Sequence, residues 1–374
     1  MSLLTVGRPK SFGHVLFLTL LILAVFVVAA SYLLVLLMGY GFVFFTSEGA
    51  ALSMRSFQFP VLLFLFLLGF YTPELQAGAV FVLIWIMYAF CFIAAWRWRE
   101  NFHAVVANSF SRPFRSLFNN FLFAMPVLSS MLFTAAYFII SSQESVGIPT
   151  GQPSFSPGTS LQEIFLQLAY APVTEELGFR LVPIGMFMTL YVFLLGRNVD
   201  GRRLKLLVTS VFYPDGAKRM AKLRNVGEHG IWRGISRGEW TIVLATSVVF
   251  GFAHVISGFG WELGKFTSVF VQGFFFAVTY LVYGFEAPIL LHWFFNYYLF
   301  FFDPSVVLQF FPATAPLLLV IESVVIALPG FPPGFSLLGV FGWIMVAAFL
   351  ARKLLKKAST KRVVPAESSV TLPS

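Results

Sequence analysis

The stretch Ala171–Arg180, which reads APVTEELGFR, decides the class of this protein. It places two adjacent carboxylates, Glu175 and Glu176, and the guanidinium of Arg180 inside a mostly apolar run that covers residues 164–195. A charged side chain in the hydrocarbon core of a bilayer costs several kcal/mol. These three side chains are therefore candidates for a functional site rather than for ordinary packing.

The composition supports a location in the membrane. The chain of 374 residues is 58% hydrophobic and only 11% charged, whereas a soluble domain carries about 25% charged residues. Apolar runs of about 17–25 residues, the length that spans a bilayer as a helix, recur along most of the chain. We expect an all-α fold, a polytopic bundle of about eight transmembrane helices, although nine or ten also fit the pattern.

The domain organisation follows from the apolar runs and the polar segments between them. We expect N-terminal transmembrane helices in residues 1–160, with an interfacial helix over residues 100–120. A catalytic core follows in 161–302, with a basic loop at 197–240. C-terminal transmembrane helices are expected in 303–351, and a basic then polar tail in 352–374.

Two apolar segments are expected not to cross. Basic residues favour the cytoplasmic side, which predicts that both termini, residues 97–120 and residues 197–240 lie on that side. An even number of crossings must then separate them, so the short run Phe57–Tyr71 and the proline-rich region 303–334 are the two segments that we predict do not span.

The net charge of +9 does not indicate nucleic-acid binding, because the Lys and Arg residues cluster in loops and tails and no phosphate-binding motif is present. We interpret the 197–240 loop as a segment that adheres to anionic lipid. The only cysteine, Cys91, lies in an apolar run, which excludes a disulfide framework and a thiolate metal site. The chain is predicted to be an integral protein of a prokaryotic cell membrane or of the endoplasmic reticulum.

Two further polar clusters follow within apolar runs. Phe250 and His254 are four residues apart, and so are His292 and Asn296, so each pair lies on one face of a helix. Together with the glutamate pair, these side chains form an inventory that suits hydrolysis inside the membrane.

The residues allow two kinds of hydrolytic site. In the first, Glu176 and Arg180 form a structural ion pair, Glu175 activates water as a general base with His254, and His292 and Asn296 stabilise the oxyanion. In the second, Glu175, His254 and His292 hold zinc with one position left for water. The spacing does not decide between them, although the motif His-Glu-x-x-His is absent and we favour the version without a metal.

The three clusters resemble the motifs of the type II CAAX-endopeptidase family, also called the CPBP or Abi family of intramembrane proteases. Those motifs read Glu-Glu-x-x-x-Arg, Phe-x-x-x-His and His-x-x-x-Asn (or Asp). Here they are carried, in the same order, by Glu175, Glu176 and Arg180, by Phe250 and His254, and by His292 and Asn296.

The resemblance implies an eight-helix bundle with its site in a cavity inside the membrane. It assigns water activation to Glu175 and His254, oxyanion support to His292 and Asn296, and a structural role to Glu176, Arg180 and Phe250. Eukaryotic members remove the last three residues from prenylated CaaX tails. The long basic insertion between the first two motifs departs from a plain member and leaves the substrate open.

We therefore predict an intramembrane endopeptidase that cuts near the C-terminus of a membrane-anchored or lipidated, CaaX-like protein. Two other functions fit the same residues. One is a transporter or channel that uses the glutamate pair as a proton or cation site, and the other is a scaffold of the same fold without catalysis.

Overall fold

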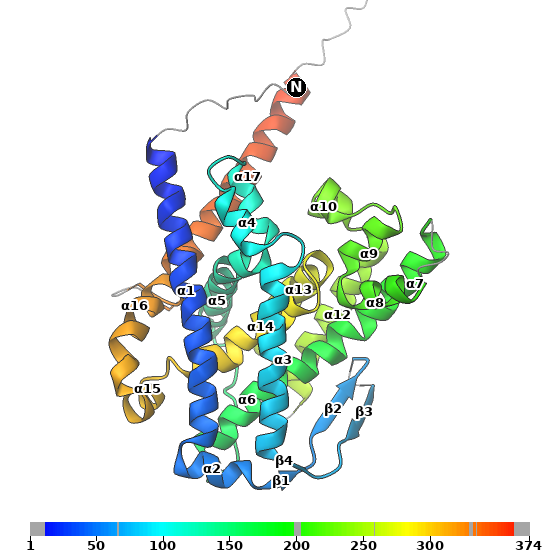
Figure 1. The fold of residues 1–374 in the computed structure, drawn as a ribbon. Coiled ribbons are helices and arrows are strands. Elements are labelled where there is room, and N and C mark those ends of the chain that lie inside the picture. The colour runs from blue at the N-terminus through cyan, green and yellow to red at the C-terminus, as the bar shows by residue number, and fades with distance from the viewer. Residues whose placement is uncertain are drawn as a thin grey trace, which may run out of the picture.

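The computed structural model describes residues 12–65, 67–197, 203–257, 259–328, 332–333 and 335–362, and these form a bundle of helices (Figure 1). Within them, seven helices are long and apolar enough to cross a membrane. The number is eight if Pro304–Phe310 and Pro312–Val325, which meet at an angle of 114°, form one broken span. The predicted polytopic helical bundle is confirmed.

The first part of the chain supplies three long helices and two small sheets. Its elements are α1 (Phe12–Phe44), α2 (Ser47–Ser53), β1 (Ser56–Phe57), β2 (Pro60–Leu63), β3 (Leu68–Tyr71), β4 (Leu75–Gln76), α3 (Ala77–Arg97), α4 (Phe102–Ala107), the 3-10 helix η1 (Phe114–Asn119) and α5 (Phe121–Ser145).

The second part begins with the glutamate pair. Its elements are α6 (Leu161–Glu176), the π-helix η2 (Leu177–Leu181), α7 (Pro183–Leu195), α8 (Arg203–Phe212), α9 (Pro214–Met220), α10 (Val226–His229), α11 (Ile231–Gly234), α12 (Arg237–Ile256), α13 (Lys265–Val282), α14 (Glu286–Trp293), the π-helix η3 (Phe294–Tyr298), α15 (Pro304–Phe310), η4 (Pro312–Thr314), α16 (Ala315–Val325) and α17 (Leu337–Arg362).

The helices that carry the first two motifs begin in the same way. At the start of α6, the Ser160 hydroxyl accepts from the Glu163 amide, and the Glu163 carboxylate accepts from the Ser160 amide. Ser236 and Glu239 form the same reciprocal pair at the start of α12. Each of these reciprocal pairs, called a capping box, satisfies two of the amides that a helix start leaves free. The two capping boxes therefore fix where both helices begin.

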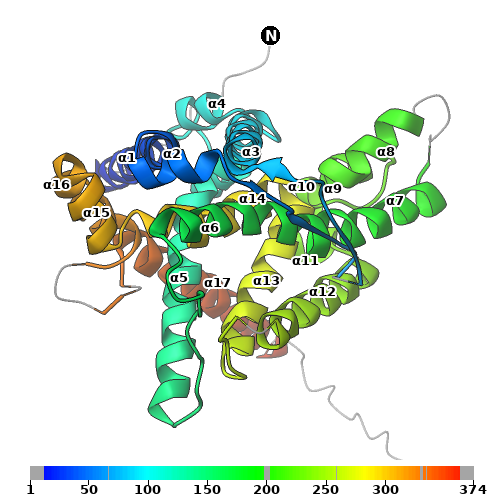
Figure 2. The ribbon, with the colours of Figure 1, turned by 90° about the horizontal axis from the view of Figure 1, so that it is seen from below.

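The short run Phe57–Tyr71 does not form a helix. Pro60–Leu63 pairs antiparallel with Leu68–Tyr71, and Ser56–Phe57 pairs with Leu75–Gln76 below it. The prediction that this run does not span is therefore confirmed for the part that the structure describes. In Figure 2, which views the molecule from below, the β2–β3 hairpin lies in front of α12, and Leu65 at its tip packs on Phe250 and Ala253 of that helix.

An aromatic core joins α14 and η3 to α1 and α3. The indole of Trp293 is fully buried and meets the rings of Tyr32 and Phe92 edge to face, with centroids 5.7 and 5.2 Å apart. Tyr297 donates its hydroxyl to the Leu36 carbonyl at 2.9 Å, so a polar atom buried in this core has a partner. This packing fixes the helix turn that presents the adjacent His292.

The basic segments gather toward one end of the molecule. Figure 1 shows the start of α1 and the end of α17 at the upper end, with α4, α9 and α10 in the upper half. The predicted topology has an even number of membrane crossings between consecutive basic segments, which requires these segments to lie at the same end. The helix α17 continues to Arg362, beyond the predicted end of the span at Ala351, so the start of the basic tail is helical; residues 363–374 lie outside the described part.

The expected interfacial helix over residues 100–120 is wrong as a single element. The segment consists of two short helices, α4 and η1, separated by Pro113. The first helix ends at Ala107, where the Asn108 side chain donates to the Ala104 carbonyl, and the second begins directly after Pro113, which has no amide to donate to a preceding turn. Asn120 then caps α5 and also donates to the carbonyls of Ala95 and Glu100.

The basic segment between the first two motifs is folded rather than a plain solvated loop. It forms α8 to α11, and a buried ion pair holds it against α12. The ammonium group of Lys218 donates to the Glu239 carboxylate at 2.7 Å and to the Gly234 carbonyl at 2.5 Å, and both charged side chains are about 1% exposed. Nearby, the Asp215 carboxylate accepts from the amides of Val226 and Gly227. The proposed contact of this segment with anionic lipid stays a prediction.

We expect Lys218→Met to unfold this segment locally, because it leaves the Glu239 carboxylate buried without its cation, at a cost of about 3–5 kcal/mol. Limited trypsin digestion should then cut residues 203–237 much faster than in the unaltered protein. The double variant Lys218→Met/Glu239→Gln, which removes the stranded charge, should regain most of the resistance. Equal digestion of all three proteins would show that the pair does not hold the segment.

Candidate active site

The first motif lies where α6 turns into the π-helix η2. Pro172 interrupts the amide ladder inside α6, and Pro183 begins α7 without needing an amide partner. Between them, residues 177–181 adopt the wider π turn. Such single-turn π segments are frequent at functional sites. Here the turn directly follows Glu175 and Glu176 and carries Arg180.

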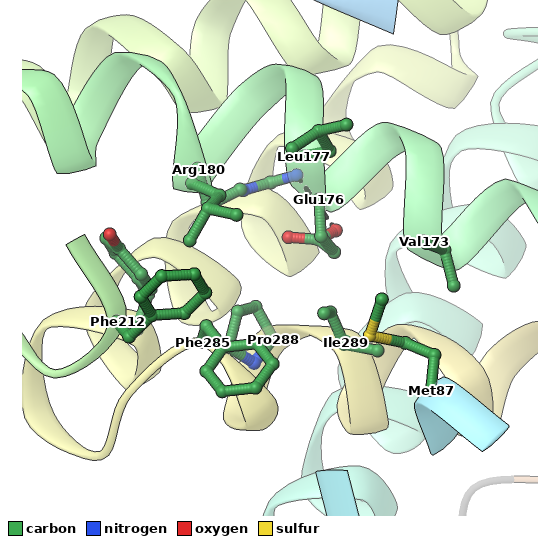
Figure 3. A pocket seen from close by; sticks show the side chains of 11 residues that line it. Met87, Val173, Glu176, Leu177, Arg180, Phe212, Phe285, Pro288 and Ile289 are labelled. Atoms are coloured by element: carbon green, nitrogen blue, oxygen red, sulfur yellow. Dashed lines mark hydrogen bonds and ion pairs between the residues drawn. The ribbon is translucent and has the colours of Figure 1, made fainter. Parts of the chain in front are cut away.

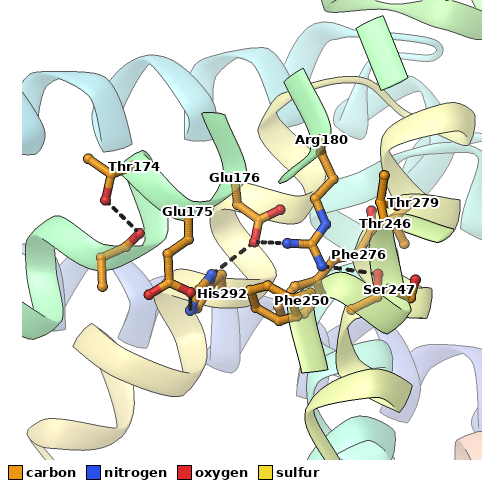
Figure 4. Close-up of polar contacts among 12 residues, drawn as sticks. Thr174, Glu175, Glu176, Arg180, Thr246, Ser247, Phe250, Phe276, Thr279 and His292 are labelled. Carbon is orange, nitrogen blue, oxygen red and sulfur yellow. Dashed lines mark hydrogen bonds and ion pairs between the residues drawn. The ribbon is translucent and has the colours of Figure 1, made fainter. Parts of the chain in front are cut away.

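Arg180 is the centre of a buried network (Figure 4). Its guanidinium donates to Glu176 Oε1 at 3.0 Å and to the Gly273 carbonyl of α13 at 3.2 Å. It also lies 4.1 Å from the centre of the Phe250 ring. Both members of the ion pair are about 1% exposed. The guanidinium of Arg180 therefore connects η2, on which it lies, to α12 and α13.

Gly273 allows this contact. A Cβ atom at that position would lie 2.8 Å from a ring carbon of Phe250 and 2.9 Å from Arg180 Nη2. Only glycine lets the guanidinium reach the helix backbone.

Glu176 has a second partner in the third motif. Its Oε1 atom lies 2.9 Å from His292 Nδ1, and Figure 4 shows the carboxylate between Arg180 and His292. The ring of His292 also stacks on Phe276, with centroids 5.4 Å apart. The carboxylate and the phenyl ring together hold the imidazole with its other nitrogen, Nε2, directed away from Glu176.

His254 is oriented by its own helix. Its Nδ1 lies 3.0 Å from the Phe250 carbonyl, one turn earlier in α12. A carbonyl oxygen only accepts, so this contact places the proton of a neutral ring on Nδ1 and leaves the lone pair on Nε2. The Phe250 ring stands edge-on to both imidazoles, with centroids 4.7 and 6.0 Å away.

The three motifs converge at the Glu175 carboxylate. Its Oε2 atom lies 3.8 Å from His254 Nε2 and 3.9 Å from His292 Nε2. These separations are too long for direct hydrogen bonds, and Oε2 is buried without a hydrogen-bond partner in the described part of the chain. Distances of this kind suit a bridging molecule that contacts all three polar atoms.

The structure places Asn296 beside this cluster but does not bond it there. The residue lies on η3, one turn after His292, and is half-buried. Among the described residues, no hydrogen bond to its side chain is present. Of the predicted site residues, Glu175, Glu176, Arg180, Phe250, His254 and His292 are thus in mutual contact or close approach, and Asn296 lies one turn away.

The zinc alternative would place a metal between Glu175, His254 and His292. The donor set of Glu175, His254 and His292 is chemically suitable, and each imidazole donates its Nδ1 proton to another group, as zinc ligands do. However, no group of three His, Cys, Asp or Glu side chains among the described residues is placed to hold a metal ion. The zinc alternative stays a prediction, and no step of the mechanism proposed below uses a metal.

A cavity lies on the other side of the ion pair. It has a volume of about 120 Å³ and is bordered by α3, α6, α8 and α14. Figure 3 shows Glu176 and Arg180 on one wall, with Phe285, Pro288 and Ile289 opposite them. Because its other lining residues are apolar except for Tyr280, whose hydroxyl already donates to the Val211 carbonyl, the cavity suits a hydrocarbon group rather than a polar ligand.

The sequence patterns missed three contributors to the site. Phe276 stacks on His292, Gly273 accepts from Arg180, and Leu65 of the hairpin donates its amide to the Gly178 carbonyl at 2.9 Å. None of them belongs to a charged motif, and each acts through a backbone atom or a ring face. A single sequence carries no signal that distinguishes such residues from ordinary core positions.

Comparison with known proteins agrees with the motifs. Residues 157–298 match the family model described as Type II CAAX prenyl endopeptidase Rce1-like. A search of curated proteins and a search of solved structures gave no match. The matched segment covers under half of the chain, contains all three motifs and overlaps the predicted core, so the family resemblance is confirmed over this segment.

Proposed function

We propose, on the premise that residues 157–298 form a type II CAAX endopeptidase core, that this protein hydrolyses a peptide bond near the C-terminus of a membrane-anchored or lipidated protein. The observation that carries the proposal is the convergence of Glu175 Oε2 with the Nε2 atoms of His254 and His292. A carboxylate without a direct partner, between two oriented imidazoles, suits the activation of water.

In the proposed first step, Glu175 removes a proton from a water molecule that His254 Nε2 helps to orient. The resulting hydroxide attacks the carbonyl carbon of the scissile bond. His292, when protonated on both nitrogens, and the Asn296 amide donate to the oxygen that becomes negative. The proton held by Glu175 then passes to the leaving amine, so no acyl-enzyme forms.

The charges of the cluster are consistent with this step. Glu175 and Glu176 carry two negative charges and Arg180 one positive charge, which leaves one negative charge in a buried site. In the proposed step, the second proton on His292 balances this charge. The contact of its Nδ1 with Glu176 at 2.9 Å supplies the acceptor that an imidazolium needs on that side.

The test is cleavage of defined substrates by purified protein. Farnesylated CaaX peptides, unprenylated controls and C-terminal peptides with other membrane anchors would be incubated with the protein in liposomes, and the products identified by mass spectrometry. We expect one bond near the prenylated cysteine to be cut and the rate to survive a chelator. Loss of cleavage with the chelator would refute the metal-free mechanism, and no cleavage of any peptide would refute the proposed function.

Asn296 offers a separate test of the oxyanion step. We expect Asn296→Ala to lower kcat about 100-fold with little change in thermal stability, because the amide makes no hydrogen bond to the described residues and acts only in the transition state. Steady-state kinetics and thermal unfolding in detergent would measure both. An unaltered kcat would remove Asn296 from the site.

A further inference from the structure

The β2–β3 hairpin presents an open sheet edge beside the candidate active site. All four residues of β3 are exposed, and the side chains of Leu68, Phe70 and Tyr71 are 62%, 55% and 68% accessible. An edge strand without a neighbour displays amide and carbonyl groups that can pair with another chain. Lipid offers no hydrogen bonds to such groups, so an edge at the depth of the bilayer core needs a protein or peptide partner.

The register shows which groups are free. The Thr72 amide donates to the Phe59 carbonyl at 2.9 Å, so in this ladder the pairs 61–70 and 63–68 exchange hydrogen bonds. The pairs 60–71 and 62–69 do not. The backbone groups of Gly69 and Tyr71 therefore point away from β2, and no other described residue bonds them.

The opposite edge of the hairpin is already in use. The Tyr170 hydroxyl of α6 donates to the Pro60 carbonyl at 2.7 Å, and the Leu65 amide donates to the Gly178 carbonyl at 2.9 Å. These two anchors lie five residues before and three residues after Glu175. The β2 side thus runs along the segment that carries the glutamate pair, which leaves the β3 edge for a partner.

The tip of the hairpin is held in a strained form at the site. Phe64 and Leu65 have φ angles of 43° and 59°, a left-handed conformation that costs a residue with a side chain about 1–2 kcal/mol. Leu65 packs on the cluster of Phe179, Phe250, Ala253 and Val269. Since Phe250 also contacts Arg180 and both catalytic imidazoles, the strain is retained where the hairpin meets the active site.

We propose that the substrate binds as an added strand on the β3 edge before cleavage. An extended segment of the substrate pairs with the outward backbone groups of Gly69 and Tyr71. Beyond the Leu68 end of β3, the substrate continues over the tip of the hairpin to Glu175. This inference rests on the proposed function and adds the way in which the enzyme holds its substrate. The partner is an extended peptide with apolar side chains, because the strand exposes Leu68 and Phe70 on one face and Tyr71 on the other.

Strand addition has a consequence that other binding modes lack. Only every second residue of an added strand directs its amide toward the neighbour. Replacing substrate amides one at a time by N-methyl amides should therefore weaken cleavage with a period of two residues. The experiment would use a farnesylated CaaX peptide that extends several residues upstream of the prenylated cysteine, and would measure kcat/KM for each N-methylated version.

We expect about a 3–10-fold loss at alternate positions and little change at the positions between them. Cleavage of the unmodified peptide with losses at every position, or at none, would overturn strand addition while leaving the proposed function intact. No cleavage of the unmodified peptide would overturn both.

The protein offers a matched pair of variants for the same contact. Tyr71→Pro removes an outward amide without removing a hydrogen bond of the β2–β3 ladder, and Tyr71→Ala removes the same side chain but keeps the amide. We expect kcat/KM of Tyr71→Pro to fall about 3–10-fold below that of Tyr71→Ala, mainly through KM. Equal values for the two variants, with equal thermal stability, would contradict pairing at this edge.

Discussion

Glu175→Gln is expected to abolish peptide cleavage while the protein folds normally. The substitution keeps the size of the side chain but removes the base, and a positioned general base contributes about 10²–10⁴-fold to the rate. Folding should change little, because Glu175 Oε2 has no hydrogen-bond partner among the described residues that the amide would lose. The measurement is product formation by mass spectrometry together with the unfolding temperature in detergent.

A matched control lies on the same helix. Glu163 is a carboxylate at the start of α6, and it pairs with Arg55 at the surface. Glutamine serves as well as glutamate at this position of a capping box, and an exposed ion pair contributes about 0–1 kcal/mol. We therefore expect Glu163→Gln to retain nearly full activity. Unaltered cleavage by Glu175→Gln would remove the proposed base and with it the hydrolytic mechanism.

Arg180→Ala is expected to prevent normal folding. Its guanidinium is fully buried and bonds both the Glu176 carboxylate and the Gly273 carbonyl. Its loss leaves Glu176 charged, buried and without its cation, which costs about 3–5 kcal/mol. This is a large part of the total stability of a typical domain, about 5–15 kcal/mol. Folded yield by size-exclusion chromatography and the unfolding temperature would both fall.

Two companion variants separate charge from shape. Arg180→Lys keeps the charge but loses the planar fork that reaches two acceptors, so an intermediate yield is expected. Arg180→Met/Glu176→Gln removes both charges and should fold better than Arg180→Ala alone, because no buried charge remains unpaired. A normal yield of Arg180→Ala would contradict the structural role of the ion pair.

The sequence alone determined the class of the protein and singled out the residues of its candidate site. Runs of apolar residues long enough to span a bilayer, interrupted by basic segments, predicted a polytopic helical bundle, because lipid admits few other folds. The cost of burying charge singled out Glu175, Glu176 and Arg180 without any knowledge of their neighbours. The spacing of four residues in Phe250–His254 and His292–Asn296 likewise follows from the period of the helix.

Only the tertiary structure decided how these residues meet. Glu176 bonds His292 across 116 positions of the chain, and no local pattern encodes a contact between helices that far apart. The same holds for the direction of each imidazole, which depends on a carbonyl in one case and on a carboxylate from another helix in the other.

The hairpin and the basic segment show the same limit for whole elements. Phe57–Tyr71 is apolar enough for a helix or a strand, and its anchors on Tyr170 and Gly178 select the hairpin. Residues 203–237 appear polar in sequence, yet Lys218 buries its charge against Glu239 of α12. Local sequence determines the periodicity of a helix and the cost of burying its charged side chains. The partners that offset this cost come from distant parts of the chain and meet those side chains only once the chain has folded.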